Sequence, residues 1–108
     1  MRAEALIEGN LSLAEATNRI NEVRTRVGLS AIPAGKTQTE LRDIVRYERR
    51  IELAQELTRF WDLRRWDLLT EAMKIAEKIN YEPKFKYAPI PQIQIDLSQN
   101  VLVQNEGY

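Results

Sequence analysis

A carboxylate in the middle of an apolar helical stripe is the feature of this sequence that most restricts its fold. At helical spacing, one face carries Glu48 among four apolar residues, Leu41, Ile44, Val45 and Ile51. A buried charge that loses its partner costs several kcal/mol, roughly 3–5. Glu48 therefore needs a cation, and arginine offers a planar set of donors that fits both carboxylate oxygens. The partners that we consider are Arg46, Arg49, Arg50, Arg59, Arg64 and Arg65.

The same region predicts a network of ion pairs, because acidic and basic residues alternate there. We expect the network to fix how two helices and the C-terminal tail meet, and its expected members are Glu48, Arg49, Arg50, Glu52, Glu56, Arg59 and Asp62. Glycoside hydrolysis also uses paired carboxylates. Carboxylates four residues apart on one helix share a direction and do not flank a substrate from opposite faces. We therefore expect no catalytic residues and no enzyme activity.

Composition excludes several other functions. The 108 residues carry 16 basic and 16 acidic side chains, so no basic surface for nucleic acid is expected. The sequence has no Cys and no His, so we expect no disulfide, no metal site and no cofactor bound through them. A hydrophobic content of 44% is too high for general disorder, and no apolar run approaches the length of a membrane span, about 20 residues.

The helical periodicity divides the chain into three parts. Residues 1–28 predict a helical hairpin, with a turn at Gly9 and Asn10 and a second helix from Leu13 to Val27. Residues 37–80 predict the central helices. Thr37 and Glu40 form a capping box, so we expect one helix from Gln38 to about Glu56 and another from Arg59 to about Ile79.

Residues 81–108 predict an extended tail, because prolines at 83, 89 and 91 interrupt any helix. Ile93, Ile95 and Leu97 alternate with polar residues, which favours a short strand-like or single-turn segment. The expected fold is therefore mainly α, with a tetratricopeptide-like hairpin, further helices and a long irregular C-terminal tail.

Trp61 and Trp66 have two interpretations. Aromatic faces can stack on sugars, so both are candidate ligand-binding residues. Both also lie in a helical stretch with apolar neighbours, where Trp more often packs in a core or an interface, and this is the interpretation that we favour.

Three segments resemble the SusD/RagB family of cell-surface glycan-binding lipoproteins of Bacteroidetes. Residues 48–54 read ERRIELA and residues 59–66 read RFWDLRRW. Residues 20–29, INEVRTRVGL, resemble the last helical hairpin of the family. The ending, with PIPQ at 89–92, IDL at 95–97 and QNEGY at 104–108, resembles how these proteins end. The family has a glycine where this chain has Leu57, and an aromatic residue where it has Gln55.

The resemblance covers nearly the whole chain and corresponds to the C-terminal part of a longer protein, as a single domain fragment. It implies a nutrient-binding protein on the extracellular face of the outer membrane, held by a lipid anchor in a preceding region. It also implies work with a TonB-dependent transporter in oligosaccharide uptake, and a sugar site built largely by the N-terminal portion. The isolated chain is then expected to bind oligosaccharides weakly or not at all.

A free-standing tetratricopeptide-like protein-interaction module is the alternative. The single hairpin and the neutral surface favour it, but it does not explain the ending. In either case, we expect the isolated chain to associate with itself, because the outer face of the first hairpin, with Leu6, Leu11 and Leu13, would lack its cover.

Overall fold

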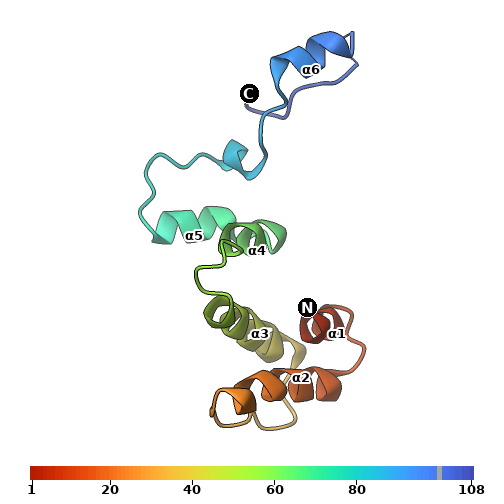
Figure 1. Cartoon of the computed structure of the whole chain (residues 1–108), viewed down its shortest axis with the longest axis vertical. Coiled ribbons are helices and arrows are strands. Elements are labelled where there is room, and N and C mark those ends of the chain that lie inside the picture. The colour runs from red at the N-terminus through yellow and green to blue at the C-terminus, as the bar shows by residue number, and fades with distance from the viewer. Residues whose placement is uncertain (100) are drawn as a thin grey trace. The chain divides into compact units, whose positions relative to one another are not determined.

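A computed structural model describes residues 1–99 and 101–108, and all regular elements within these residues are helical. The expectation of a mainly α fold is confirmed. The chain forms two compact units, Met1–Leu57 and Thr58–Tyr108. The first contains α1 (Arg2–Glu8), α2 (Leu13–Arg26) and α3 (Gln38–Glu52) (Figure 1). The second contains α4 (Arg59–Arg65), α5 (Leu69–Ile75), the 3-10 helix η1 (Pro83–Lys86) and α6 (Gln92–Leu97).

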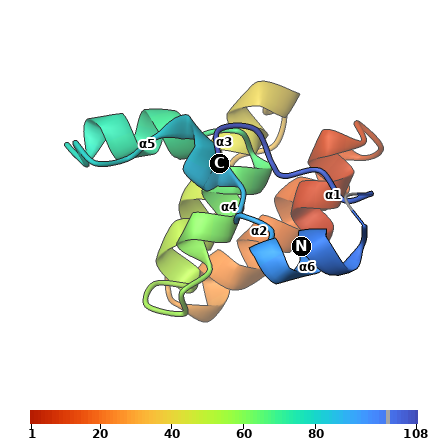
Figure 2. The same ribbon diagram turned by 90° about the horizontal axis from the view of Figure 1, so that it is seen from above.

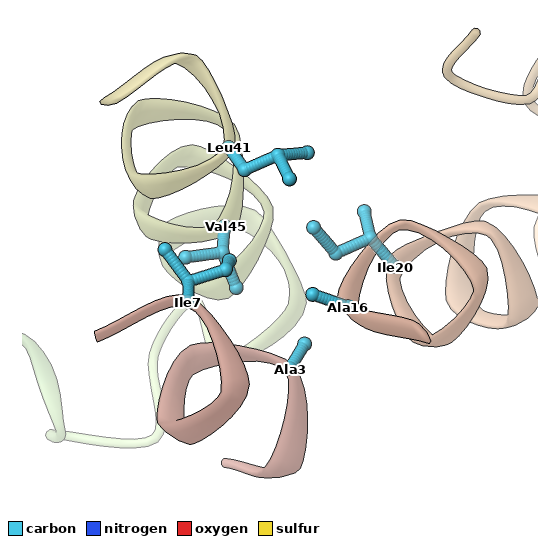
Figure 3. Packing of buried hydrophobic residues seen from close by; sticks show 6 residues of the cluster. All are labelled: Ala3, Ile7, Ala16, Ile20, Leu41 and Val45. Atoms are coloured by element: carbon cyan, nitrogen blue, oxygen red, sulfur yellow. The ribbon is translucent and has the colours of Figure 1, made fainter. Parts of the chain in front are cut away.

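The first unit is a three-helix arrangement around one apolar cluster. Helix α1 packs against both α2 and α3, as both views of the chain show (Figures 1 and 2). The side chains of the cluster point toward one another from the three helices (Figure 3), and they are Ala3, Ile7, Ala16, Ile20, Leu41 and Val45. Leu6 and Leu13 pack against this cluster. The expectation that these two residues belong to an uncovered outer face is therefore wrong.

Side-chain caps fix where the two longer helices begin. The Ser12 hydroxyl accepts a hydrogen bond from the Glu15 amide at 3.2 Å, at the start of α2. At the start of α3, Thr37 accepts from the Glu40 amide, and the Glu40 carboxylate accepts from the Thr37 amide at 2.9 Å. The predicted capping box is confirmed. It could be predicted because Thr and Glu at this spacing are enough to form it.

Helix ends differ more from the expectation than helix starts. The C-terminus of α1 has Gly9 in a right-handed conformation, and Asn10 is the residue with positive φ, at 48°. The amides of Asn10 and Leu11 then donate to the carbonyls of Ile7 and Leu6, the hydrogen-bond pattern of a Schellman motif. Asn adopts this conformation because its short polar side chain tolerates it.

Helix α3 ends at Glu52, four residues earlier than predicted. Gln55 and Leu57 have φ of 69° and 57°, so the backbone turns left-handed twice after the helix. Such a conformation costs a non-glycine residue roughly 1–2 kcal/mol. Leu57 thus adopts the left-handed turn that the resemblance places at this position without the glycine that would remove the cost.

The predicted helix from Arg59 to Ile79 is divided into α4 and α5, so its continuity was predicted wrongly. Asp67 has φ of 59°, and the Leu68 amide donates to the Leu63 carbonyl at 2.8 Å. Glu77 repeats this motif after α5 with φ of 53°. Neither position has the glycine that usually marks a Schellman motif, and the break therefore has no clear sequence signal.

The tail is less extended than predicted, because residues 83–86 form η1 and residues 92–97 form α6, which agrees with the single-turn rather than the strand-like alternative. After α6, the chain returns toward the segment that follows η1 (Figure 1). The Gln104 amide group binds both backbone groups of Ile90, accepting from its N–H and donating to its carbonyl at 2.8 Å each. Asn105 donates to the Ala88 carbonyl at 2.6 Å, and the Tyr108 hydroxyl donates to the Tyr87 carbonyl at 2.9 Å.

Gly107 allows this close return of the chain. Its φ is +89°, and a Cβ at this position would lie 3.0 Å from the Cβ of Lys84. A larger residue would meet both backbone strain and a steric contact there. The ending QNEGY is thus explained residue by residue, since its Gln, Asn, Gly and Tyr each contribute to the return.

Candidate binding surface

Glu48 forms its ion pair with Arg24 of α2, which is not among the six arginines predicted as its partners. The two side chains are 14% and 22% exposed, so the pair is largely removed from water. Arg24 Nε also donates to the Ser30 carbonyl at 2.8 Å, which holds the guanidinium in place. The partner is distant in sequence because α2 and α3 pack side by side in the first unit. The prediction that an arginine pairs with Glu48 is confirmed. The prediction that this arginine lies nearby in sequence was wrong.

Two other predicted members of the ion network, Glu52 and Asp62, form ion pairs within their own units. Glu52 pairs with Arg26, again between α3 and α2. In the second unit, Arg65 Nε lies 3.0 Å from Asp62 Oδ1, and Asp62 is buried at 4% exposure. Arg49 contacts the Met1 sulfur, while Arg50 and Glu56 are exposed. That one network links the helices and the tail stays a prediction.

A cavity of about 330 Å³ lies in the first unit, beside Glu48 and Glu52 of α3. Ile20, Val23, Val45 and Leu53 give it apolar walls, and charged side chains, including those of Arg19 and Glu48, line the rest. The ion pairs beside it join opposite charges, Arg24 with Glu48 and Arg26 with Glu52. The described residues also hold no group of three or more potential metal ligands.

The second unit has an open hollow of about 440 Å³ with a different character. It is lined by two aromatic and three basic residues, Trp61, Arg64, Arg65, Lys86 and Tyr87. We call it the Trp61 hollow. The first three of these residues come from α4, where spacings of three and four place side chains on one face. Lys86 and Tyr87 come from the end of η1 and the residue after it.

The Arg64 guanidinium lies close to two aromatic rings. Its Cζ is 5.5 Å from the Trp61 ring and 5.3 Å from the Tyr87 ring, both within the range of a cation–π interaction. Lys86 pairs with Asp67, and its Nζ is also 5.9 Å from the Tyr87 ring. The hydrogen bond to Asp67 raises the pKa of Lys86, and the charge of Arg64 acts in the opposite direction. Arg64 and Lys86 are therefore close enough to repel each other.

The C-terminal residues position Tyr87. The Tyr108 hydroxyl donates to the Tyr87 carbonyl, and Asn105 binds the next carbonyl along the chain. The backbone at Tyr87 is extended, with φ of −117° and ψ of 145°. The return of the tail thus fixes the segment that carries one wall of the Trp61 hollow.

Of the two tryptophans predicted as candidate ligand residues, Trp61 is 59% exposed and lines the hollow. Trp66 is half-buried, and Arg65 Cζ lies 4.9 Å from its ring. Three lining residues of the hollow were not predicted as binding residues: Arg64, Lys86 and Tyr87. Helical spacing from Trp61 could have found Arg64, but no sequence signal places Tyr87 beside α4.

The chain resembles proteins of one family in both sequence and fold. The SusD family model matches residues 1–108. SusD-like protein P2 of Formosa agariphila is 32% identical over 117 residues, which cover 98% of this chain and 23% of that protein. A solved structure of a SusD-like protein from Bacteroides fragilis matches with a TM-score of 0.75 and 29% identity, over 98% of this chain and 23% of that one. The chain belongs to the SusD family, and it spans 23% of the length of each of these relatives.

Proposed function

We propose that this chain is part of a cell-surface glycan-binding protein that takes up oligosaccharides together with a TonB-dependent outer-membrane transporter. The observation that carries the proposal is the match to the SusD family over the whole of residues 1–108. The protein would act by binding rather than by catalysis. It would be held at the extracellular face of the outer membrane by a lipid anchor outside these residues. Within the described part of the chain, no helix is both long and apolar enough to span a bilayer.

The role that we propose for the matched segments is structural. The apolar cluster of α1, α2 and α3 and the ion pairs from α3 to α2 give a rigid three-helix support. The glycan site of the whole protein would be built mainly by parts that this chain does not include. For this reason the isolated chain is expected to bind neutral oligosaccharides no more tightly than millimolar, since a site needs several convergent groups on a concave surface.

The test uses the natural polypeptide that carries this chain, tagged in its source bacterium. We expect it in the outer-membrane fraction, co-purifying with a TonB-dependent transporter, and retaining oligosaccharides on a glycan array. The isolated chain serves as the control and should retain no neutral glycan on the same array. Recovery of the natural polypeptide with intracellular proteins, and no transporter or glycan, would instead support a helical protein-interaction module.

A further inference from the structure

The charges of the Trp61 hollow are not balanced. Arg64, Arg65 and Lys86 bring three positive charges, and the adjoining carboxylates are Asp62, paired with Arg65, and Asp67, paired with Lys86. One positive charge therefore remains, and it belongs to Arg64. Among the described residues, the Arg64 guanidinium makes cation–π contacts with the rings of Trp61 and Tyr87 and forms no ion pair.

Two aromatic rings hold a guanidinium but do not satisfy its donors. Arginine has five N–H groups in a planar arrangement, and the edges of that plane suit the two oxygens of a carboxylate. The rings of Trp61 and Tyr87 provide no oxygen or nitrogen acceptor at the Arg64 contact. The hollow thus presents a preoriented cation whose hydrogen-bond donors are available to a ligand.

The aromatic side chains also remain accessible at this place. Trp61 is 59% exposed and Tyr87 is 48% exposed. Sites for small ligands combine such apolar faces with a few well-placed polar groups. A ligand that fits has one face that stacks on an aromatic ring and a carboxylate at its edge, and a uronic acid unit of an oligosaccharide has both.

We propose that the Trp61 hollow binds acidic oligosaccharides, with the uronate carboxylate on Arg64 and the sugar ring stacked on Trp61. Lys86 adds positive charge at the rim, and Tyr87 keeps the guanidinium in place. This inference rests on the proposed function, because it names a class of glycan that the protein takes. It adds a subsite on α4 and the tail, apart from the parts of the protein that this chain lacks.

The test titrates the 108-residue chain with tetragalacturonate and, in parallel, with the neutral tetramer maltotetraose, followed by tryptophan fluorescence and calorimetry. We expect tetragalacturonate to bind at least tenfold more tightly than maltotetraose, and added salt to weaken it. Arg64→Gln should weaken tetragalacturonate binding about tenfold or more, as expected for a charge-assisted bidentate contact. Lys74→Gln is the matched control, because it removes one positive charge of the same unit outside the hollow. It should keep the affinity.

Equal affinities for the two tetramers, or equal losses in Arg64→Gln and Lys74→Gln, would overturn the inference. Far-ultraviolet circular dichroism of each variant establishes that it is folded. A further variant, Arg64→Lys, keeps the positive charge but removes the planar set of donors. Glycan retention by the natural polypeptide, with no preference of the isolated chain for the acidic tetramer, would leave the proposed function standing and reject this subsite. Failure of the natural polypeptide to retain any glycan would reject the proposed function itself.

Discussion

At the scale of single residues, two ion pairs join α2 and α3, and the pair between Arg24 and Glu48 is the less exposed of the two. Its two side chains are less exposed than those of the Arg26–Glu52 pair, which are 60% and 41% exposed. A charge that loses its partner in a partly buried place cannot recover full hydration. A charge on the surface can. The two pairs join the same two helices, so they allow a direct comparison.

Replacing Glu48 with Ala is expected to lower the free energy of unfolding by about 1–3 kcal/mol, because Arg24 is left largely buried without its carboxylate. The measurement is urea unfolding followed by circular dichroism. Glu52→Ala is the control and should cost no more than about 0.5 kcal/mol, because its pair is exposed. Equal losses in the two variants would contradict this ranking.

The sequence pattern predicted correctly that Glu48 needs a partner. It did not predict which residue that partner is. Glu48 was singled out because of its place on an apolar stripe, and this periodicity is local information. Arg24 is its partner because α2 and α3 pack together, which depends on the tertiary fold. The Trp61 hollow shows the same limit. Its α4 residues follow from helical spacing, but Tyr87 reaches it only through the hydrogen bonds of the returning tail.

At the scale of elements, the capped starts of α2 and α3 and the ends of α1 and α2 could be predicted, whereas the break between α4 and α5 could not. A start is marked by a side chain that caps it, as Thr37 and Glu40 do for α3. The ends of α1, α4 and α5 depend on Asn10, Asp67 and Glu77 in the left-handed region, and of these only Asn commonly marks such a turn. The short helix α6 was hidden for a related reason, since its alternating apolar residues also fit a strand.

The capping box of α3 predicts a pH dependence of stability. The pKa of Glu40 is lowered from its ordinary 4.5 to about 2, chiefly by the hydrogen bond from Lys36 and then by those from Thr37. The carboxylate is favoured in the folded state, so its contribution is complete above pH 4.5 and is lost as the pH falls through about 2. Glu40→Gln should therefore lower the thermal midpoint above pH 4.5, with the difference disappearing near pH 2.

The pH series needs a variant that removes a carboxylate without removing a cap. Glu56→Gln is suitable, because Glu56 is exposed and lies outside the capped start of α3. Its thermal midpoint should follow that of the unmodified chain across the series. A difference between Glu40→Gln and the unmodified chain that stays constant with pH would exclude the titration of Glu40 as its cause.

At the scale of the whole molecule, the chain has many apolar side chains without cover. Leu11 is 76% exposed in the first unit, and Ile75, Ile79 and Val103 are 74%, 91% and 81% exposed in the second. The relatives are several times longer than this chain, which spans 23% of each. An apolar surface of this extent favours contact with further protein surface.

The isolated chain is expected to self-associate as its concentration rises, because association removes this apolar surface from water. Sedimentation velocity over a concentration series would show a weight-average mass above the 12.6 kDa of one chain. The double variant Leu11→Gln and Ile79→Gln should shift the series toward the monomer. A single species of monomer mass at every concentration would show that these surfaces do not associate.

The return of the tail has a consequence for how the second unit folds. Hydrogen bonds from Gln104, Asn105 and Tyr108 to residues 87–90 close a loop of the chain, and α6 lies entirely inside it. A helix of six residues does not overcome the cost of its own nucleation in water. Closing the loop reduces the conformations open to the segment between its ends, which lowers the entropy that α6 loses on forming. The hydrogen bonds of the last residues thus close this loop. We expect α6 and the Tyr87 wall of the Trp61 hollow to form, and to unfold, together with these hydrogen bonds.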